Sequence, residues 1–227
     1  MAELLNLKKG ELLNLKKDSF KKLNIGLGWD ITNGRTYDID AFVLCFDNYD
    51  RYLGKVYYGR LYQFGIKHLG DNLTGEGDGD DETIQINLEI LDSQVKKIRV
   101  FANIFAAGQR TFNEIDNAFI RLYNPLNNEE LAIYNLSEQN RNFNAFYFAD
   151  LDILNDEIRF SIVAEGLNGN IDNIVDSYVK NAVNNNYEQL SDSQNNTELQ
   201  RKPEKKKNVF KRIADFFVQK DNLWINM

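Results

Sequence analysis

Residues 71–82 have the sequence Asp-Asn-Leu-Thr-Gly-Glu-Gly-Asp-Gly-Asp-Asp-Glu, and residues 83–91 continue as Thr-Ile-Gln-Ile-Asn-Leu-Glu-Ile-Leu. The second stretch alternates apolar and polar side chains, which is typical of a strand with one buried face. The first stretch holds six carboxylates and no basic residue. At about 5 Å and an effective dielectric near 20, each neighbouring pair of carboxylates repels by roughly 3 kcal/mol. A compact loop here therefore needs a counter-charge, and its glycines allow backbone carbonyls to turn toward a bound cation.

The chemistry of this acidic stretch favours calcium among the common metal ions. Many flexible oxygen ligands suit Ca²⁺, whereas Mg²⁺ keeps more water and zinc or copper prefers histidine and cysteine. The alternative is a solvated connection between two strands. An EF-hand is excluded because Leu73 and Gly75 occupy ligand positions, and a β-roll is excluded because no second copy follows. A dinucleotide site is also excluded, because the carboxylates would repel a pyrophosphate.

Four separated blocks of sequence resemble the TerD-like family of tellurium-resistance and calcium-dependent stress proteins. His68-Leu69-Gly70 leads into the acidic stretch, and the other blocks are Gly26-Leu27-Gly28-Trp29-Asp30, Asp38-Ile39-Asp40-Ala41 and Asn117-Ala118-Phe119-Ile120-Arg121. The resemblance covers about residues 10–168. It implies a calcium-binding β-sandwich that takes part in the response to chemical stress.

Asp38 and Asp40 stand two positions apart at the start of a predicted strand, so both side chains point to one face and Ile39 points to the other. Two carboxylates on one face can share a metal ion. The resemblance implies that these residues and Asp30 lie near the acidic stretch and form one or two calcium sites at one end of the sandwich. The expected metal ligands are Asp30, Asp38, Asp40, Asp71, Asn72, Gly75, Gly77, Asp78, Asp80, Asp81 and Glu82.

Short strand-like runs separated by asparagine, aspartate and glycine predict an all-β fold, a β-sandwich of mostly antiparallel strands. The heptapeptide Glu-Leu-Leu-Asn-Leu-Lys-Lys occurs at 3–9 and 11–17 and predicts two sheet-edge strands whose lysines oppose unwanted pairing. Tyr57, Tyr58 and Tyr62 are expected in the core or on a sheet face. The remaining predicted strands are 23–29, 41–46, 55–66, 97–105, 117–123, 131–135, 145–151 and 158–165.

The C-terminal part of the chain predicts three further segments. Apolar residues spaced by three and four indicate a helix over 171–182, which completes a domain of residues 1–183. Residues 184–208 are polar and predict a flexible linker. Residues 209–227 carry an apolar stripe with basic flanks and predict an amphipathic tail helix. This tail is expected to dock on its own domain, a partner protein or an anionic membrane surface.

Charge and composition limit the function. The net charge is −7, and the absence of a basic surface over residues 1–200 excludes nucleic acid as the main partner. No signal peptide or membrane span is predicted, so we expect a cytoplasmic protein, with peripheral membrane contact through its tail. His68 and Cys45 are the single histidine and cysteine. Neither residue is part of a recognisable catalytic motif, so we expect that the protein is not an enzyme.

The function that these expectations favour is that of a calcium-binding stress-response protein. Ca²⁺ would order the acidic loops at one end of the sandwich into an interaction platform, and tellurite resistance would follow by an indirect, non-enzymatic route. The alternative is a metal-independent scaffold or binding module that acts through its amphipathic tail.

Overall fold

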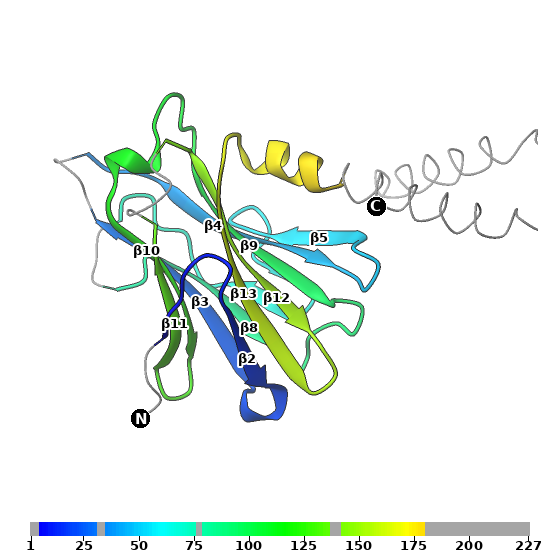
Figure 1. Cartoon of the computed structure of the whole chain (residues 1–227). Helices are drawn as coiled ribbons and strands as arrows, with labels where there is room; N and C mark the ends of the chain where they lie inside the picture. The colour runs from blue at the N-terminus through cyan, green and yellow to red at the C-terminus, as the bar shows by residue number, and fades with distance from the viewer. Residues whose placement is uncertain (1–4, 31–34, 76–78, 137–141, 180–227) are drawn as a thin grey trace, which may run out of the picture. The chain divides into compact units, whose positions relative to one another are not determined.

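Two β-sheets packed face to face make up the part of the chain that the computed structural model describes, residues 5–30, 35–75, 79–136 and 142–179 (Figure 1). The first sheet has the order β1 (Leu5–Asn6), β11 (Glu129–Asn135), β10 (Asp116–Asn124), β3 (Lys22–Asp30), β8 (Glu82–Asn87), β7 (Ile66–His68) and β6 (Tyr62–Gln63). The second has the order β2 (Leu12–Lys16), β13 (Glu157–Leu167), β12 (Ala145–Ile153), β9 (Lys97–Ile104), β4 (Ile39–Phe46) and β5 (Tyr52–Val56). Neighbouring strands are antiparallel except for β1 and β11, and the predicted all-β sandwich is confirmed.

The main core lies between the two sheets, where alternate residues of each strand point inward. In β8, Ile84 and Ile86 are fully buried while Thr83 and Gln85 are half-buried, as the period of two predicts. Strand β4 is buried on both faces. Its second face, with Phe42 and Leu44, packs against the helical residues 171–179, which confirms the predicted C-terminal helix over its described part.

The two copies of the repeated heptapeptide each form one edge of a sheet. Its first copy contains β1, at the edge of the first sheet, and its second copy contains β2, at the edge of the second sheet. The corresponding leucines of the two copies, Leu7 and Leu15, are both buried in the core. The prediction of two edge strands is therefore confirmed, and the repeat links one sheet to the other.

Three predictions within residues 55–91 are wrong in detail. The single run predicted over 55–66 is divided among three strands: the end of β5, β6 and the first residue of β7. The chain turns between Tyr57 and Arg60, which exchange backbone hydrogen bonds of 3.2 and 2.9 Å, and again at residues 64–65. Tyr58 was expected in the core or on a sheet face, but it is exposed in this turn, whereas Tyr62 lies in β6 and is exposed there. Strand β8 ends at Asn87, whose side chain accepts a hydrogen bond from the Glu89 N–H and so favours a turn.

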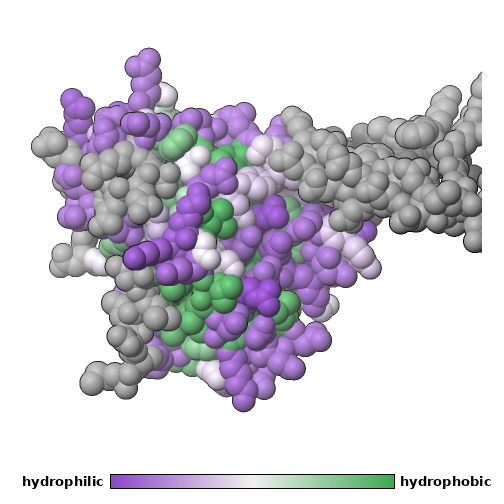
Figure 2. All heavy atoms as spheres, viewed as in Figure 1, coloured by the Kyte–Doolittle hydropathy of each residue, from purple (hydrophilic) through white to green (hydrophobic). Residues whose placement is uncertain are grey.

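The predicted linker over 184–208 and the predicted tail over 209–227 lie outside the described residues and stay predictions, as does the domain boundary at residue 183. Two 3₁₀ turns, η1 (Lys17–Ser19) and η2 (Phe112–Glu114), complete the described secondary structure. No helix among the described residues is long and apolar enough to cross a membrane. Figure 2 shows one face of the molecule, on which hydrophilic residues predominate and apolar residues gather near the middle.

Candidate metal centre

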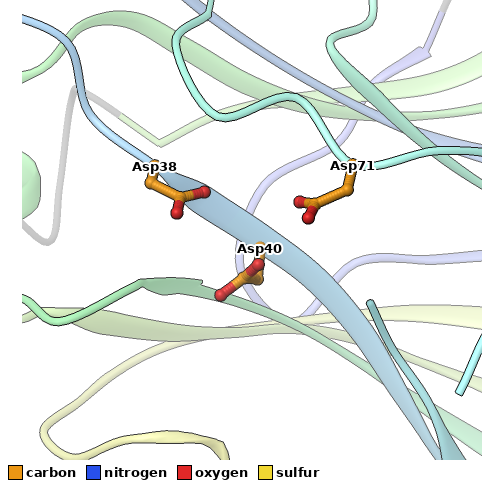
Figure 3. A group of neighbouring side chains, drawn as sticks. All are labelled: Asp38, Asp40 and Asp71. Atoms are coloured by element: carbon orange, nitrogen blue, oxygen red, sulfur yellow. The ribbon is translucent and has the colours of Figure 1, made fainter. Parts of the chain in front are cut away.

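Three carboxylates meet at the end of the sandwich where β4 begins. Asp38 precedes β4, Asp40 lies in it, and Asp71 reaches toward both from the segment after β7 (Figure 3). One oxygen atom from each lies within 4.8 Å of the others. The residue between them, Ile39, is fully buried in the core. This confirms the prediction that the side chains of Asp38 and Asp40 share one face of the strand and that Ile39 points to the other. We call these three side chains the carboxylate cluster.

Asp40 is the most unusual member of the carboxylate cluster. Its residue is only 2% exposed, and its Oδ2 atom has no hydrogen-bond partner among the described residues. Burial raises the pKa of Asp40 to about 8, with further contributions from the negative charges of Glu82, Asp38 and Asp71. A buried carboxylate without a partner is costly for a protein to keep. A cation between the three carboxylates would remove this cost.

A second buried pair supports the carboxylate cluster from inside. Glu82, the first residue of β8, accepts a hydrogen bond from the Ala41 N–H of β4, and its Oε2 lies 3.4 Å from His68 Nε2. Both side chains are fully buried. Burial is the main factor that raises the pKa of Glu82, while His68 and the Ala41 N–H lower it. Because β8 and β4 belong to different sheets, the hydrogen bond between Ala41 and Glu82 joins the two sheets next to Asp40.

The end of the acidic stretch folds back over β3. Asp80 forms a two-pronged ion pair with Arg121 of β10, with Nε–Oδ1 and Nη2–Oδ2 distances of 2.7 and 3.0 Å. Arg121 also contacts Glu130 of β11 at 3.1 Å. The Asp80 carboxylate rests on Gly26, where a Cβ atom would collide with it. The glycine therefore serves the close approach of this loop, and Arg121 is the counter-charge that the acidic stretch requires.

Asp81 holds the two ends of the acidic stretch together. Its Oδ2 accepts a hydrogen bond from the Trp29 N–H at 2.9 Å, and its Oδ1 accepts one from Asn72 Nδ2 at 2.8 Å. Asn72 in turn accepts bonds from the backbone of Thr74 and Gly75 at 3.1 Å each. Burial is the largest cause that raises the pKa of Asp81. These contacts use both oxygens of Asp81, one toward β3 and one within the acidic stretch.

The sequence was compared with known proteins, and residues 4–178 match the TerD domain. The chain belongs to the TerD family. It is 36% identical over 173 residues to the tellurium resistance protein TerD of Serratia marcescens, which covers 72% of this chain and 90% of that protein. It is also 33% identical over 198 residues to the stress response protein SCP2 of Bacillus subtilis, which covers 77% of this chain and 99% of that protein.

The fold agrees with solved structures of similar proteins. A homologue of telluride resistance protein from Streptomyces coelicolor superposes with a TM-score of 0.59 at 17% identity, over 67% of this chain and 93% of that chain. The protein SAV2460, described as of unknown function, gives a TM-score of 0.59 at 20% identity, over 66% of this chain and 92% of that one. The resemblance expected from the separated sequence blocks is confirmed.

This TerD domain distributes the predicted ligands over several places. Asp38, Asp40 and Asp71 form the carboxylate cluster, with Glu82 behind it. Asp30 receives a 2.6 Å hydrogen bond from Asn117 Nδ2 and lies close enough to Asp81 to raise the pKa of that carboxyl group. The other predicted ligands are Asn72, Gly75, Asp80 and Asp81, which lie in the folded acidic stretch, and Gly77 and Asp78, which lie outside the described residues.

Arg121 is the last residue of the block 117–121 that resembles the TerD family, but its role as the partner of Asp80 was not predicted. A sequence signal for it exists: the acidic stretch contains no base of its own and must find one elsewhere in the chain. The position of a basic residue in the sequence does not show which one pairs with Asp80. Arg121 lies 41 residues from Asp80 and comes into contact with it only because β10 pairs with β3.

The substitution Arg121→Gln is expected to destabilise the TerD domain by about 2–3 kcal/mol, because it leaves the nearly buried Asp80 without its counter-charge. Urea unfolding measures the effect. Arg159→Gln is the matched control, because the Arg159 side chain is 41% exposed and pairs with Glu157 on the same strand at 3.4 Å. Equal stability of the two variants would show that the Asp80–Arg121 pair does not hold the loop.

Proposed function

We propose that this TerD domain binds Ca²⁺ at the carboxylate cluster, and that the protein acts in resistance to tellurium compounds or related chemical stress, as the names of its relatives state for those proteins. The observation that carries the calcium proposal is the buried, unpartnered carboxylate of Asp40 facing two further carboxylates. Such a group is unfavourable in the absence of a cation and favourable with one.

The donor set supports Ca²⁺ over other divalent ions. Every donor in the carboxylate cluster is a carboxylate oxygen, the type that Ca²⁺ binds in sets of six to eight. The one nearby nitrogen ligand, His68, is fully buried and directed at Glu82. A zinc ion would require nitrogen or sulfur ligands that this cluster does not present. Ca²⁺ would join β4 to the segment after β7, and the loops ordered in this way would serve as an interaction platform.

We propose a non-enzymatic role. Reduction of tellurite by the protein itself would require an accessible thiol or a redox cofactor. Cys45, the single cysteine of the sequence, is fully buried, and burial raises the pKa of its thiol to about 12. The single histidine is also buried, which leaves it unsuited to acid–base chemistry on a dissolved substrate. These features support an indirect contribution to resistance.

Titration calorimetry of the full chain after removal of bound metal tests the proposed site. We expect a Ca²⁺ binding isotherm that Asp71→Asn weakens at least tenfold, because Asp71 supplies one of three carboxylates and is itself exposed, so that its loss leaves the fold intact. Asp18→Asn, an exposed carboxylate in η1, is the matched control and should bind as the parent does. Absence of Ca²⁺ binding by the parent would favour the alternative of a metal-independent module.

The pH dependence of stability provides an independent check. The pKa of Asp40 is about 8 in the folded domain, against about 3.8 when unfolded. Between these values the folded protein holds a proton that the unfolded chain has released, so the stabilisation that this proton gives falls as pH rises. In calcium-free buffer, stability should fall with rising pH by up to about 1.4 kcal/mol per unit more in the parent than in Asp40→Asn. Urea unfolding at pH 5.5, 6.5 and 7.5 measures this difference. Parallel curves for the two proteins would contradict the assignment.

A further inference from the structure

Exposed apolar side chains occur on several separate segments that also carry, or contact, the residues of the carboxylate cluster. We call Tyr58, Leu69, Leu73 and Phe105 the apolar rim. Leu69 and Leu73 each lie two residues from Asp71 and are 47% and 59% exposed. Tyr58 and Phe105 are 36% and 47% exposed. Exposed apolar residues are ordinary when scattered, but a group of them beside one charged site indicates a contact surface.

Direct contacts place the aromatic half of the apolar rim beside the cluster. The Phe105 N–H donates a 2.8 Å hydrogen bond to the carbonyl of Asp38. The ring of Tyr58 lies edge-on to that of Phe105, with 5.8 Å between ring centres. Burial raises the pKa of Tyr58, and the next largest cause is the negative charge of Asp40. Tyr58 and Phe105 thus border the same carboxylates that would hold the ion.

The chemistry of such a site fits a ligand that is anionic and apolar at once. One oxygen from each of three carboxylates leaves Ca²⁺ short of its six to eight ligands, so positions on a bound ion stay open to outside oxygens. Phosphate oxygens are hard anionic ligands of this kind. Tyrosine, phenylalanine and leucine favour the boundary between lipid headgroups and acyl chains.

The negative net charge of the domain means that contact with an anionic surface requires a bound cation. Residues 1–200 contain 19 basic and 31 acidic residues, a balance of −12. Without a cation, the carboxylate cluster would repel an anionic surface and keep the apolar rim in water. With Ca²⁺ bound, the attraction to phosphate and the burial of the rim act in the same direction.

We propose that the carboxylate cluster and the apolar rim together form a calcium-dependent binding surface for anionic phospholipid membranes. This proposal rests on the proposed calcium site. It differs from the membrane contact predicted for residues 209–227, which depends on basic side chains and needs no calcium. A protein partner with acidic groups would use the same ion and is the competing outcome of the test.

Cosedimentation of the full chain with vesicles tests the proposal. Vesicles of phosphatidylserine and phosphatidylcholine, and vesicles of phosphatidylcholine alone, are compared in Ca²⁺ and in chelator. We expect the Ca²⁺-dependent part of binding to require phosphatidylserine. The double variant Tyr58→Ser/Phe105→Ser should lower that part at least tenfold while its Ca²⁺ affinity without vesicles stays within twofold of the parent.

A matched double variant controls for the loss of any two exposed apolar side chains. Tyr49 is 63% exposed in the turn after β4, at the opposite end of that strand from Asp40. Leu126 is 66% exposed in the turn after β10, at the opposite end of that strand from Asp116, which pairs with Asp30 of β3. Tyr49→Ser/Leu126→Ser should sediment as the parent does, whereas Asp40→Asn should lose Ca²⁺ and the Ca²⁺-dependent binding together.

Each result separates the two proposals. Ca²⁺ binding in calorimetry without Ca²⁺-dependent sedimentation overturns the membrane proposal, favours a protein partner and leaves the calcium site standing. Equal sedimentation of the Tyr58→Ser/Phe105→Ser variant and the parent also overturns it. Absence of Ca²⁺ binding in calorimetry removes the proposed function itself.

Discussion

Calcium is expected to raise the melting temperature of the metal-free protein by about 5–10 °C. An ion that binds only the folded state stabilises it by about 2.7 kcal/mol at a hundredfold excess over its dissociation constant, and a domain of this size gains about 2–4 °C per kcal/mol. The physical source is the end of the carboxylate repulsion at Asp38, Asp40 and Asp71. Scanning calorimetry of the full chain, with chelator and with excess Ca²⁺, measures the shift.

Magnesium at the same concentration is the control for this experiment. It requires a small octahedral arrangement and gives up its water reluctantly, so it should shift the melting temperature much less. A melting curve that is unchanged by saturating Ca²⁺ would contradict the metal site and leave the acidic stretch as a solvated connection. Equal shifts from both ions would indicate a general charge effect rather than a site selective for calcium.

The substitution Asp40→Asn is expected to have opposite effects with and without calcium. In calcium-free buffer at pH 8 it should stabilise the protein by about 1–3 kcal/mol, because it removes a buried, unpartnered charge and offers amide donors to Asp38 and Asp71. In Ca²⁺ it should lower the affinity at least a hundredfold, because the central ligand is lost. Urea unfolding and titration calorimetry measure the two effects.

The control for Asp40→Asn is Asp18→Asn, which removes the same charge from an exposed position. It should change neither stability nor Ca²⁺ affinity appreciably. If Asp40→Asn destabilised the metal-free protein, the Asp40 carboxylate would have a structural role in the empty state. The site would then have to be assigned to other residues.

The candidate site shows how far local patterns reach. The alternation over residues 83–91 predicted β8, and the spacing of Asp38 and Asp40 predicted that both side chains share one face, because strand geometry fixes side-chain direction over two residues. The acidic stretch predicted a need for positive charge. It was expected to act as one cage of ligands, however, and the structure assigns its residues to different partners. Asp71 joins Asp40, whereas Asp80 pairs with Arg121 and Asp81 closes the loop.

Resemblance supplied what local patterns could not. The matching of several separated blocks implied the sandwich and the nearness of residues 38–40 to the acidic stretch, and both are observed. The aromatic residues were harder to place. Tyr58 is in a turn, because the run predicted over 55–66 is broken at Tyr57–Arg60, and Tyr62 is exposed on the short edge strand β6. Their exposure depends on where the turn falls.

The sequence by itself determined the strand-rich fold class, the buried faces of the strands and the family, because each depends on spacing within short segments or on matched blocks. Only the tertiary structure decided that Asp40 is buried without a partner, that Arg121 neutralises Asp80 and that Tyr58 and Phe105 border the carboxylate cluster. These facts depend on strand order, which brings β4 beside β9 and β3 beside β10. Contacts between residues tens of positions apart follow from that order, since the energy of a charge depends on its neighbours in space rather than along the chain.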